Sequence, residues 1–336
     1  MYNESIKKKS RCDMTIKEIA QQLNISISTV SKALNGATDI SDETKKKICD
    51  YAKSVGYKSK QPPRRILVLF ESPDSNRSSS VLSDIFTAFS AAARKENYEI
   101  ICDFVALQPE DFNLNDYLQE NNFCAAFLLG INLYSRVYKQ LHETQVPLVL
   151  LDNYIPNHPL IASVSCENII AVQHAVFYLS KKGHSKIGFL AGEPRSYVSA
   201  ERFSGYILGS AICGLEYTGD NVFYGDFTKD SGERAAEFFK DRDITAVICC
   251  SDLMAIGLID GLKKNGIAVP DDISVIGFDD MSWIKHTAYQ LTTIKQDFVV
   301  MGKSALAQIN EMLSGRNSQR VILAHQLIER STVKQL

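Results

Sequence analysis

The chain is organised around Met14-Thr-Ile-Lys-Glu-Ile-Ala-Gln-Gln-Leu-Asn-Ile-Ser-Ile-Ser-Thr-Val-Ser-Lys-Ala-Leu-Asn-Gly36. Thr15 and Glu18 form a T-x-x-E capping box, in which each side chain satisfies the other residue's free backbone N–H, so a helix should begin at Ile16. The apolar spacing of that helix is then broken, and Ser26 is a good N-cap for a second helix. The stretch therefore predicts two short helices joined by a tight turn.

A third helix is expected after Ser41 and should end at Gly56. Three short helices, the second of which displays small polar side chains and Lys32 on its outer face, are typical of a helix-turn-helix unit. In such a unit the second helix enters the major groove of DNA. The alternative from the pattern alone is a small solvated bundle whose lysines only keep it soluble.

Basic side chains are concentrated at the start of the chain. Residues 1–65 hold 14 Lys and Arg against 7 Asp and Glu, residues 66–336 hold 23 against 32, and the whole chain has a formal charge of −2. A basic head on an acidic body is expected if only the head approaches phosphate, because that attraction supplies affinity independent of base sequence.

Several classes of protein are disfavoured by what the sequence lacks. It has no run of 18 apolar residues and no apolar signal core at its start, so a cytosolic protein without a membrane segment is expected. The eight cysteines show no C-x-x-C spacing, which predicts buried thiols and no metal site. Without a G-x-S-x-G, P-loop, G-x-G-x-x-G or H-E-x-x-H motif, neither a cofactor nor catalysis is expected.

After the head, short apolar runs alternate with amphipathic stretches such as Val81–Arg94. This alternation predicts βαβ units, and hence parallel sheets covered by helices on both faces. Eight strands over roughly 215 residues divide better into two sheets than into one. The expected strands are Ile66–Phe70, Glu99–Phe104, Ala125–Leu129, Leu148–Leu151, Lys186–Leu190, Val222–Tyr224, Ala246–Cys250 and Ser274–Phe278.

Particular phrases of the sequence add to this pattern. Besides the opening stretch they are Leu179–Gly192, Ser251–Gly257, Val269–Asp280 and Leu291–Ile294. In these phrases the chain resembles the LacI (lactose repressor) family of bacterial transcription regulators. The resemblance implies a small all-α helix-turn-helix head and an α/β effector region of two Rossmann-like parallel-sheet lobes, which is the type I periplasmic-binding-protein fold.

The resemblance also implies a domain organisation. It divides the chain into a helix-turn-helix DNA-binding domain, a short linker and a two-lobed domain for effector binding and dimerisation, at 13–57, 58–65 and 66–336. One lobe would comprise about 66–163 with 294–320, and the other about 165–290 with the C-terminal segment. The linker departs from the family, whose longer hinge carries a leucine that wedges into the minor groove, because here two prolines disfavour a helix.

A residue-by-residue match to the family assigns roles in recognising a double-stranded DNA operator. Ile27, Ser28 and Lys32 occupy base-reading positions, where lysine can donate to guanine and isoleucine can contact a thymine methyl. Ile16 belongs to the same expected interface. The residues expected to hold phosphates are Thr15, Ser26, Thr29, Ser31 and Asn35. Because two heads must sit on successive half-sites of a pseudo-palindrome, a symmetric homodimer is expected, with no tetramerising heptads after Thr332.

Polar residues follow several of the expected strands, where ligands bind in doubly wound sheets. Arg202 lies in an R-x-x-G-Y motif whose arginine points into the cleft in the family. The candidate effector residues are Ser72, Asp152, Arg202, Phe227, Ser251 and Asp279. Carboxylates accept hydrogen bonds from hydroxyls and an aromatic face stacks on a ring, so the expected effector is a sugar or sugar derivative. Asp252 and Asp280 are expected to be helix N-caps instead.

The favoured interpretation is an effector-responsive regulator, most simply a repressor, of carbohydrate-related genes. One alternative is a regulator that senses a nucleoside or purine. A second is a solute-binding protein for transport, which the basic head disfavours. A third is a carbohydrate-acting enzyme in which Asp152 and Asp279 form an acid/base pair.

Overall fold

The computed structural model describes residues 14–34, 37, 39–55, 57, 63–72, 79–286 and 289–336. It divides into two compact units, residues 1–62 and residues 63–336. Among the described helices, none is long and apolar enough to cross a membrane. The described cysteines are all free; Cys166, Cys249 and Cys250 are buried as expected, whereas Cys102 is exposed.

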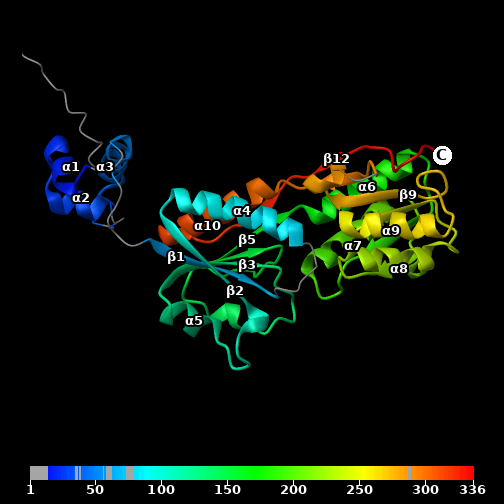
Figure 1. The fold of residues 1–336 in the computed structure, drawn as a ribbon, viewed down its shortest axis with the longest axis horizontal. Coiled ribbons are helices and arrows are strands. Elements are labelled where there is room, and N and C mark those ends of the chain that lie inside the picture. Colours follow the sequence, from blue (N-terminus) through cyan, green and yellow to red (C-terminus); the bar gives the residue numbers. More distant parts are fainter. Residues whose placement is uncertain are drawn as a thin grey trace, which may run out of the picture. The chain divides into compact units, whose positions relative to one another are not determined.

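The first unit is a bundle of three helices (Figure 1), as the sequence predicts: α1 (Ile16–Leu23), α2 (Ile27–Leu34) and α3 (Asp42–Ser54). The predicted capping box is present, because the Thr15 N–H donates to Glu18 Oε2 at 2.7 Å and the Glu18 N–H donates to Thr15 Oγ1 at 3.4 Å. Apolar residues from all three helices form its core: Ile19, Ala20, Val30, Ala33, Ile48 and Ala52.

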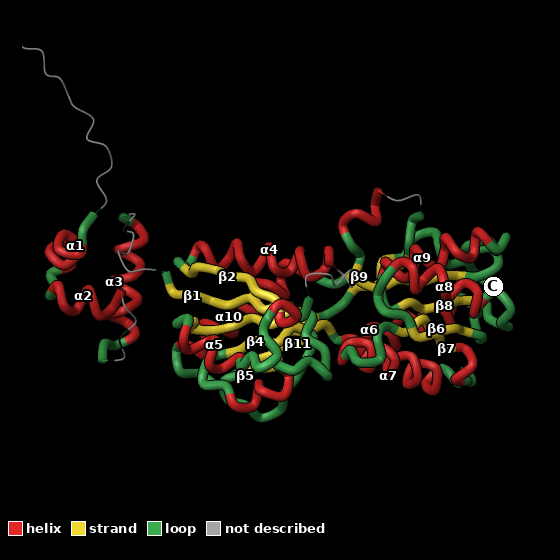
Figure 2. The backbone as a smooth tube through the Cα atoms, turned by 60° about the horizontal axis from the view of Figure 1, so that its bottom comes forward, coloured by secondary structure: helices red, strands yellow, loops and turns green. Residues whose placement is uncertain are grey.

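The second unit contains two six-stranded sheets, each covered by helices (Figures 1 and 2). The first sheet has the order β11-β5-β4-β3-β1-β2 and the second β12-β10-β9-β8-β6-β7. Its strands are β1 (Arg64–Phe70), β2 (Tyr98–Phe104), β3 (Phe123–Leu129), β4 (Leu148–Leu151), β5 (Ile161–Cys166), β6 (Ile187–Ala191), β7 (Val222–Tyr224), β8 (Ala246–Cys249), β9 (Ser274–Asp279), β10 (Thr292–Lys295), β11 (Arg320–Leu323) and β12 (Gln326–Ile328). Apart from the antiparallel β10–β12 pair, all pairs are parallel, which confirms the predicted fold class.

Helices pack in pairs on these sheets. In the first lobe α4 packs against α10, and in the second α6 packs against α7 and α8 against α9 (Figure 1). The α-helices of this unit are α4 (Ser79–Lys95), α5 (Leu114–Glu120), α6 (Asn168–Lys181), α7 (Tyr197–Ile212), α8 (Lys229–Phe239), α9 (Asp252–Lys264) and α10 (Phe298–Leu313), with 3-10 turns at Val105–Leu107, Tyr138–Glu143, Gly219–Asn221 and Ser282–His286.

Four strands lie outside the eight expected ones. In β5, Ser163 and Ser165 alternate with apolar residues, so the segment does not read as a buried strand although every one of its residues is buried. The strands β10, β11 and β12 are only three or four residues long; β10 and β12 contain polar residues, and Arg320 and Ile322 of β11 are exposed. The expectation of eight strands was therefore too low.

The chain crosses between the lobes three times. It leaves the first sheet after β5, returns between β10 and α10, and leaves again between β11 and β12. Ile294 and Lys295, which the sequence places in the first lobe, pair with β9 and β12 of the second sheet. Arg64 and Arg65, expected to be linker, already belong to β1, where Arg65 donates to the Asn121 carbonyl oxygen at 2.6 Å.

Candidate functional site

The outer face of α2 presents the side chains that the sequence assigns to DNA. Ser26, Ser28 and Lys32 are exposed, and the apolar Ile27 is 50% exposed. The Ser26 hydroxyl accepts a hydrogen bond from the Thr29 N–H at 3.0 Å, so Ser26 caps the helix as predicted. An apolar side chain held in water at the start of a helix is available for contact with a thymine methyl.

The remaining predicted DNA residues have varied environments. Thr15 is exposed in the capping box, and Ile16 is half-buried against the core of the head. Thr29 and Ser31 are half-buried on α2. Asn35 lies outside the described residues.

An ion pair that the sequence did not predict holds Lys32. Its Nζ lies 2.5 Å from Asp39 Oδ2, and both side chains are 55% exposed. The hydrogen bond from Lys32 lowers the pKa of Asp39. Because an exposed pair of this kind is weak, Lys32 can exchange Asp39 for another acceptor.

In the second unit, the carboxyl ends of strands from both sheets enclose a cavity of about 400 Å³. All six candidate effector residues line it: Ser72, Asp152, Arg202, Phe227, Ser251 and Asp279. Ser72 follows β1 and Asp152 follows β4 in the first lobe, whereas the other four come from the second lobe. A ligand in this cavity would therefore contact both lobes at once.

Backbone strain is concentrated at the same place. The described residues with positive φ, other than glycine, include four asparagines and four residues of other types. Those four are Asp152 (φ 54°), Phe227 (φ 65°), Asp279 (φ 122°) and Asp280 (φ 53°), and the first three line the cavity. Non-glycine residues in this region each cost about 1–3 kcal/mol and persist mainly at functional sites.

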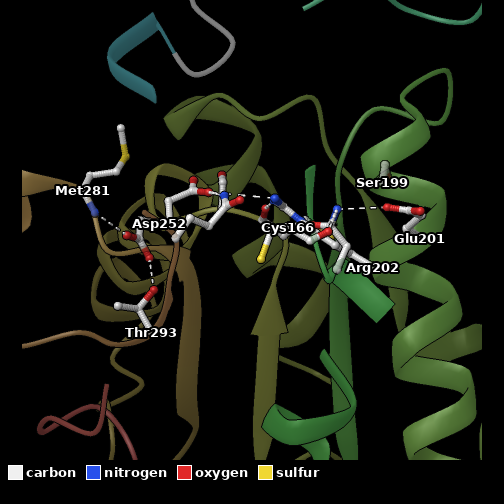
Figure 3. A network of polar contacts seen from close by, with 12 residues as sticks. Cys166, Ser199, Glu201, Arg202, Asp252, Met281 and Thr293 are labelled. Carbon is white, nitrogen blue, oxygen red and sulfur yellow. Dashed lines mark hydrogen bonds and ion pairs between the residues drawn. The ribbon is translucent and has the colours of Figure 1, made fainter. Parts of the chain in front are cut away.

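Arg202 is the centre of a buried polar network (Figure 3). It is only 3% exposed, and its Nε donates to Asn168 Oδ1 at 2.9 Å while Nη1 donates to the Cys250 carbonyl oxygen. Its guanidinium lies 3.6 Å from the centre of the Phe278 ring and 4.0 Å from Asp279 Oδ1. The arginine is thus held rigidly at the wall of the cavity.

The positive charge of Arg202 affects the pKa values of two buried carboxyl groups. Burial raises the pKa of Asp152 to about 7 and also raises the pKa of Asp279, and in each case the charge of Arg202 opposes part of the increase. Asp279 additionally accepts a hydrogen bond from Gln296 Nε2 at 2.8 Å. Carboxyl groups poised between charged and neutral forms in a cavity are typical of binding sites.

The predicted N-cap roles of Asp252 and Asp280 are wrong. Ser251 caps α9 instead, since its hydroxyl accepts from the Met254 N–H at 3.2 Å. Asp252 is the next residue, and its buried carboxyl accepts from the Met281 N–H and from the Thr293 hydroxyl (Figure 3). Asp280 pairs with Arg330 at 2.6 Å. The sequence could not show these partners because they lie on distant segments.

Three further residues of the cavity were not among the predicted ones. Glu71, Asn153 and Gln296 line it and each carries a buried side-chain oxygen without a hydrogen-bond partner. The rule that ligands bind at strand ends does indicate Glu71, which follows the first expected strand, although it was not chosen as an effector residue; the same rule could have found Asn153, the neighbour of Asp152. Gln296 follows β10, a strand that the sequence did not reveal.

Comparisons with known proteins agree with this architecture. Residues 15–60 match the family model "Bacterial regulatory proteins, lacI family", and residues 176–333 match "Periplasmic binding protein-like domain". The chain is 28% identical to the HTH-type transcriptional repressor CytR of Escherichia coli (strain K12), over 92% of this chain and 93% of that protein.

Solved structures show the same fold. The complex of the transcriptional regulator CelR with cellobiose is 25% identical and has a TM-score of 0.72, covering 95% of this chain and 99% of that one. The lac repressor dimer bound to operator and the anti-inducer ONPF is 22% identical, with a TM-score of 0.69 and coverage of 96% and 100%.

The relatives are named as transcriptional repressors and regulators, which confirms the prediction that the protein is not an enzyme. For the same reason, the alternatives of a solute-binding protein for transport and of a carbohydrate-acting enzyme are not retained. The chain therefore joins a DNA-binding domain of the lacI family of bacterial regulatory proteins to a periplasmic-binding-protein-like domain.

Proposed function

We propose that this regulator is a dimeric repressor of carbohydrate-related genes, whose affinity for a pseudo-palindromic operator changes when a sugar or sugar derivative binds between the lobes. The observation that carries the proposal is the single cavity onto which Ser72, Asp152, Arg202, Phe227, Ser251 and Asp279 converge. Carboxylates, a guanidinium and an aromatic face together suit a polyhydroxylated ring. The solved complex of CelR with cellobiose supports the class of ligand.

Lobe closure is the mechanism that this arrangement favours. Near the cavity, a loop of the first lobe touches a loop of the second. There the Leu133 N–H donates to the Arg195 carbonyl oxygen at 3.2 Å, and the Arg195 guanidinium lies 5.4 Å from the centre of the Tyr134 ring. A ligand that contacts both lobes changes their preferred angle, and in a dimer that angle sets the spacing of the two heads.

In this proposal α2 reads the operator through Ile27, Ser28 and Lys32, while Thr15, Ser26, Thr29, Ser31 and Asn35 hold its phosphates and Ile16 lies in the same interface. Selection from random duplexes at moderate salt, followed by sequencing, tests it together with the solution mass of the complex. A pseudo-palindromic consensus bound by two chains is expected. A monomer on the selected DNA at micromolar protein would contradict the dimer.

Replacing Lys32 by alanine should relax the preference at one base pair of each half-site. The loss of discrimination there is expected to be about 1–3 kcal/mol, because lysine donates to base-edge acceptors that the wrong pair lacks. Competition binding on single-substitution operators measures it. Lys53→Ala, which removes an exposed lysine from α3, is the matched control. Uniform weakening of Lys32→Ala on every operator would show that Lys32 contacts only phosphate.

Replacing Gly192 by alanine should weaken effector binding about tenfold, the consequence of an overpacking cost of about 1–2 kcal/mol. A Cβ at Gly192 would lie 2.2 Å from the ring of Phe227, which lines the cavity, so the ring must shift. Calorimetric titration with a bound sugar measures the change. Gly219→Ala is the control, because its new Cβ meets only the Tyr217 hydroxyl at 3.9 Å. Equal affinities for both variants would show that the ring does not narrow the site.

A further inference from the structure

Hydrogen-bond acceptors without partners are gathered around the cavity. Among the described residues that line it, four carry a buried side-chain oxygen with no hydrogen-bond partner: Glu71 Oε2, Asp152 Oδ1, Asn153 Oδ1 and Gln296 Oε1. Two come from carboxyl groups and two from amides, and they stand at the ends of three different strands. A buried acceptor left unpaired is unfavourable, so a bound donor at each one is strongly favoured.

The hydrogen-bond donors of the same residues are already used by the protein. Asn153 Nδ2 donates to the Ile131 carbonyl oxygen and Gln296 Nε2 donates to Asp279 Oδ1. These bonds fix each amide with its oxygen as the free atom. The free side-chain atoms of these four residues are therefore acceptors.

The charged side chains that line the cavity are mostly acidic. Among the described residues that line the cavity, four are acidic, Glu71, Asp152, Glu193 and Asp279, and one is a cation, Arg202. Burial raises the pKa values of Glu71, Asp152 and Asp279, which shows that these carboxyl groups are incompletely compensated. A negatively charged group bound beside them would meet like charge in a poorly solvated site.

We infer that the cleft selects a ligand which presents hydrogen-bond donors and carries no negative charge: an unphosphorylated neutral sugar or amino sugar. The inference rests on the proposed function and narrows its ligand class. Hydroxyl and ammonium groups donate to the four free oxygens, whereas a nucleobase presents, beside its N–H donors, ring nitrogens or carbonyl oxygens that would face acceptors. Apolar residues of the first lobe, such as Phe70, Leu129 and Leu151, cover the carbon face of the ring.

A matched ligand series on the full chain tests this inference. Glucose, glucosamine, glucuronate and glucose 6-phosphate share one ring and differ in one group, and the same series on galactose, with cellobiose, adenosine and hypoxanthine, covers other shapes. Thermal unfolding and calorimetric titration report binding. We expect a neutral or amino sugar to bind and its phosphorylated and carboxylated counterparts to bind at least about 100-fold more weakly, as like charges in a dry site require.

Variants then identify the groups responsible. Glu71→Gln and Asp152→Asn each keep the shape of the side chain and remove a carboxyl charge. Measured above the folded-state pKa of Asp152 of about 7, each should reduce the ratio of neutral-sugar to anionic-sugar affinity about tenfold. Asp243→Asn is the control, because Asp243 is an exposed acid of the second lobe that pairs with Lys186. It should leave the discrimination unchanged. Equal narrowing in all three variants would show a general field effect and overturn the assignment to these carboxyl groups.

The inference is overturned if a sugar phosphate or uronate binds as tightly as the neutral sugar, if adenosine or hypoxanthine binds more tightly than every sugar, or if no sugar of the series binds. The proposed function is judged separately, by whether the ligand that does bind changes operator affinity. A nucleoside that binds and changes operator affinity would refute the donor-rich class and preserve the regulator. A sugar that binds without changing operator affinity would support the donor-rich ligand class and refute the effector-responsive regulator.

Discussion

Replacing Arg202 by methionine is expected to lower the free energy of unfolding by about 3–5 kcal/mol, the usual cost of leaving a buried charge without its partner. The arginine is 3% exposed and stands beside the buried carboxyl of Asp279, and its charge also offsets part of the burial cost of Asp152. Methionine fills the space but supplies neither charge nor donors. Chemical denaturation measures the change, and effector binding should be lost in the same variant.

Two further variants make this result interpretable. Arg242→Met removes an arginine that also stacks on an aromatic ring, with its guanidinium 4.3 Å from the centre of Phe238, but at an exposed position. It should change the free energy of unfolding by no more than about 0.5 kcal/mol. Adding Asp279→Asn to Arg202→Met should recover part of the loss, because the uncompensated charge is then removed. A loss below about 1 kcal/mol for Arg202→Met would show that the network does not rely on the arginine.

The contribution of Asp152 to stability should fall as the pH rises, and Asp152→Asn should remove that contribution. The folded-state pKa of Asp152 is raised to about 7, whereas an aspartate in the unfolded chain ionises near 3.8. Its contribution to the free energy of unfolding is therefore full below about pH 4 and is lost as the pH rises to about 7. At about 1.4 kcal/mol for each unit of pKa, the wild type should lose about 3 kcal/mol more than Asp152→Asn over this range.

Denaturation of the two proteins at pH 4, 5, 6 and 7 measures that difference, because groups other than Asp152 contribute almost equally to both. Glu237→Gln is a suitable control: hydrogen bonds from Lys240 and Asn265 lower the pKa of the exposed Glu237, so its small effect has the opposite sign. Parallel curves for wild type and Asp152→Asn would show that folding does not raise the pKa of the Asp152 carboxyl.

The three helices of the first unit could be predicted almost completely from the sequence. The capping box at Thr15, the N-cap at Ser26 and the apolar spacing act over three or four residues, and the structure confirms the helices they imply. The Lys32–Asp39 ion pair was not predicted, because a contact between exposed side chains seven residues apart leaves no periodic signal.

The fold class of the second unit was predicted from the sequence, but several of its strands were not. Apolar runs revealed the central strands, whereas β5 hides two buried serines and β10 carries polar threonines. The missed β10 explains the missed Gln296, since a residue can be placed at a strand end only when the strand is known. The true partners of Asp252, 29 and 41 residues away at Met281 and Thr293, depend on tertiary packing.

The most direct test is the affinity of the full-length protein for its selected operator, measured by fluorescence anisotropy with and without a saturating effector found in the sugar series. The account predicts at least a tenfold change, in either direction, because a coupling of about 1.4 kcal/mol or more is typical of linked sites. It also predicts that Gly192→Ala needs more effector to produce the same change. An operator affinity that stays the same at saturating effector would contradict it.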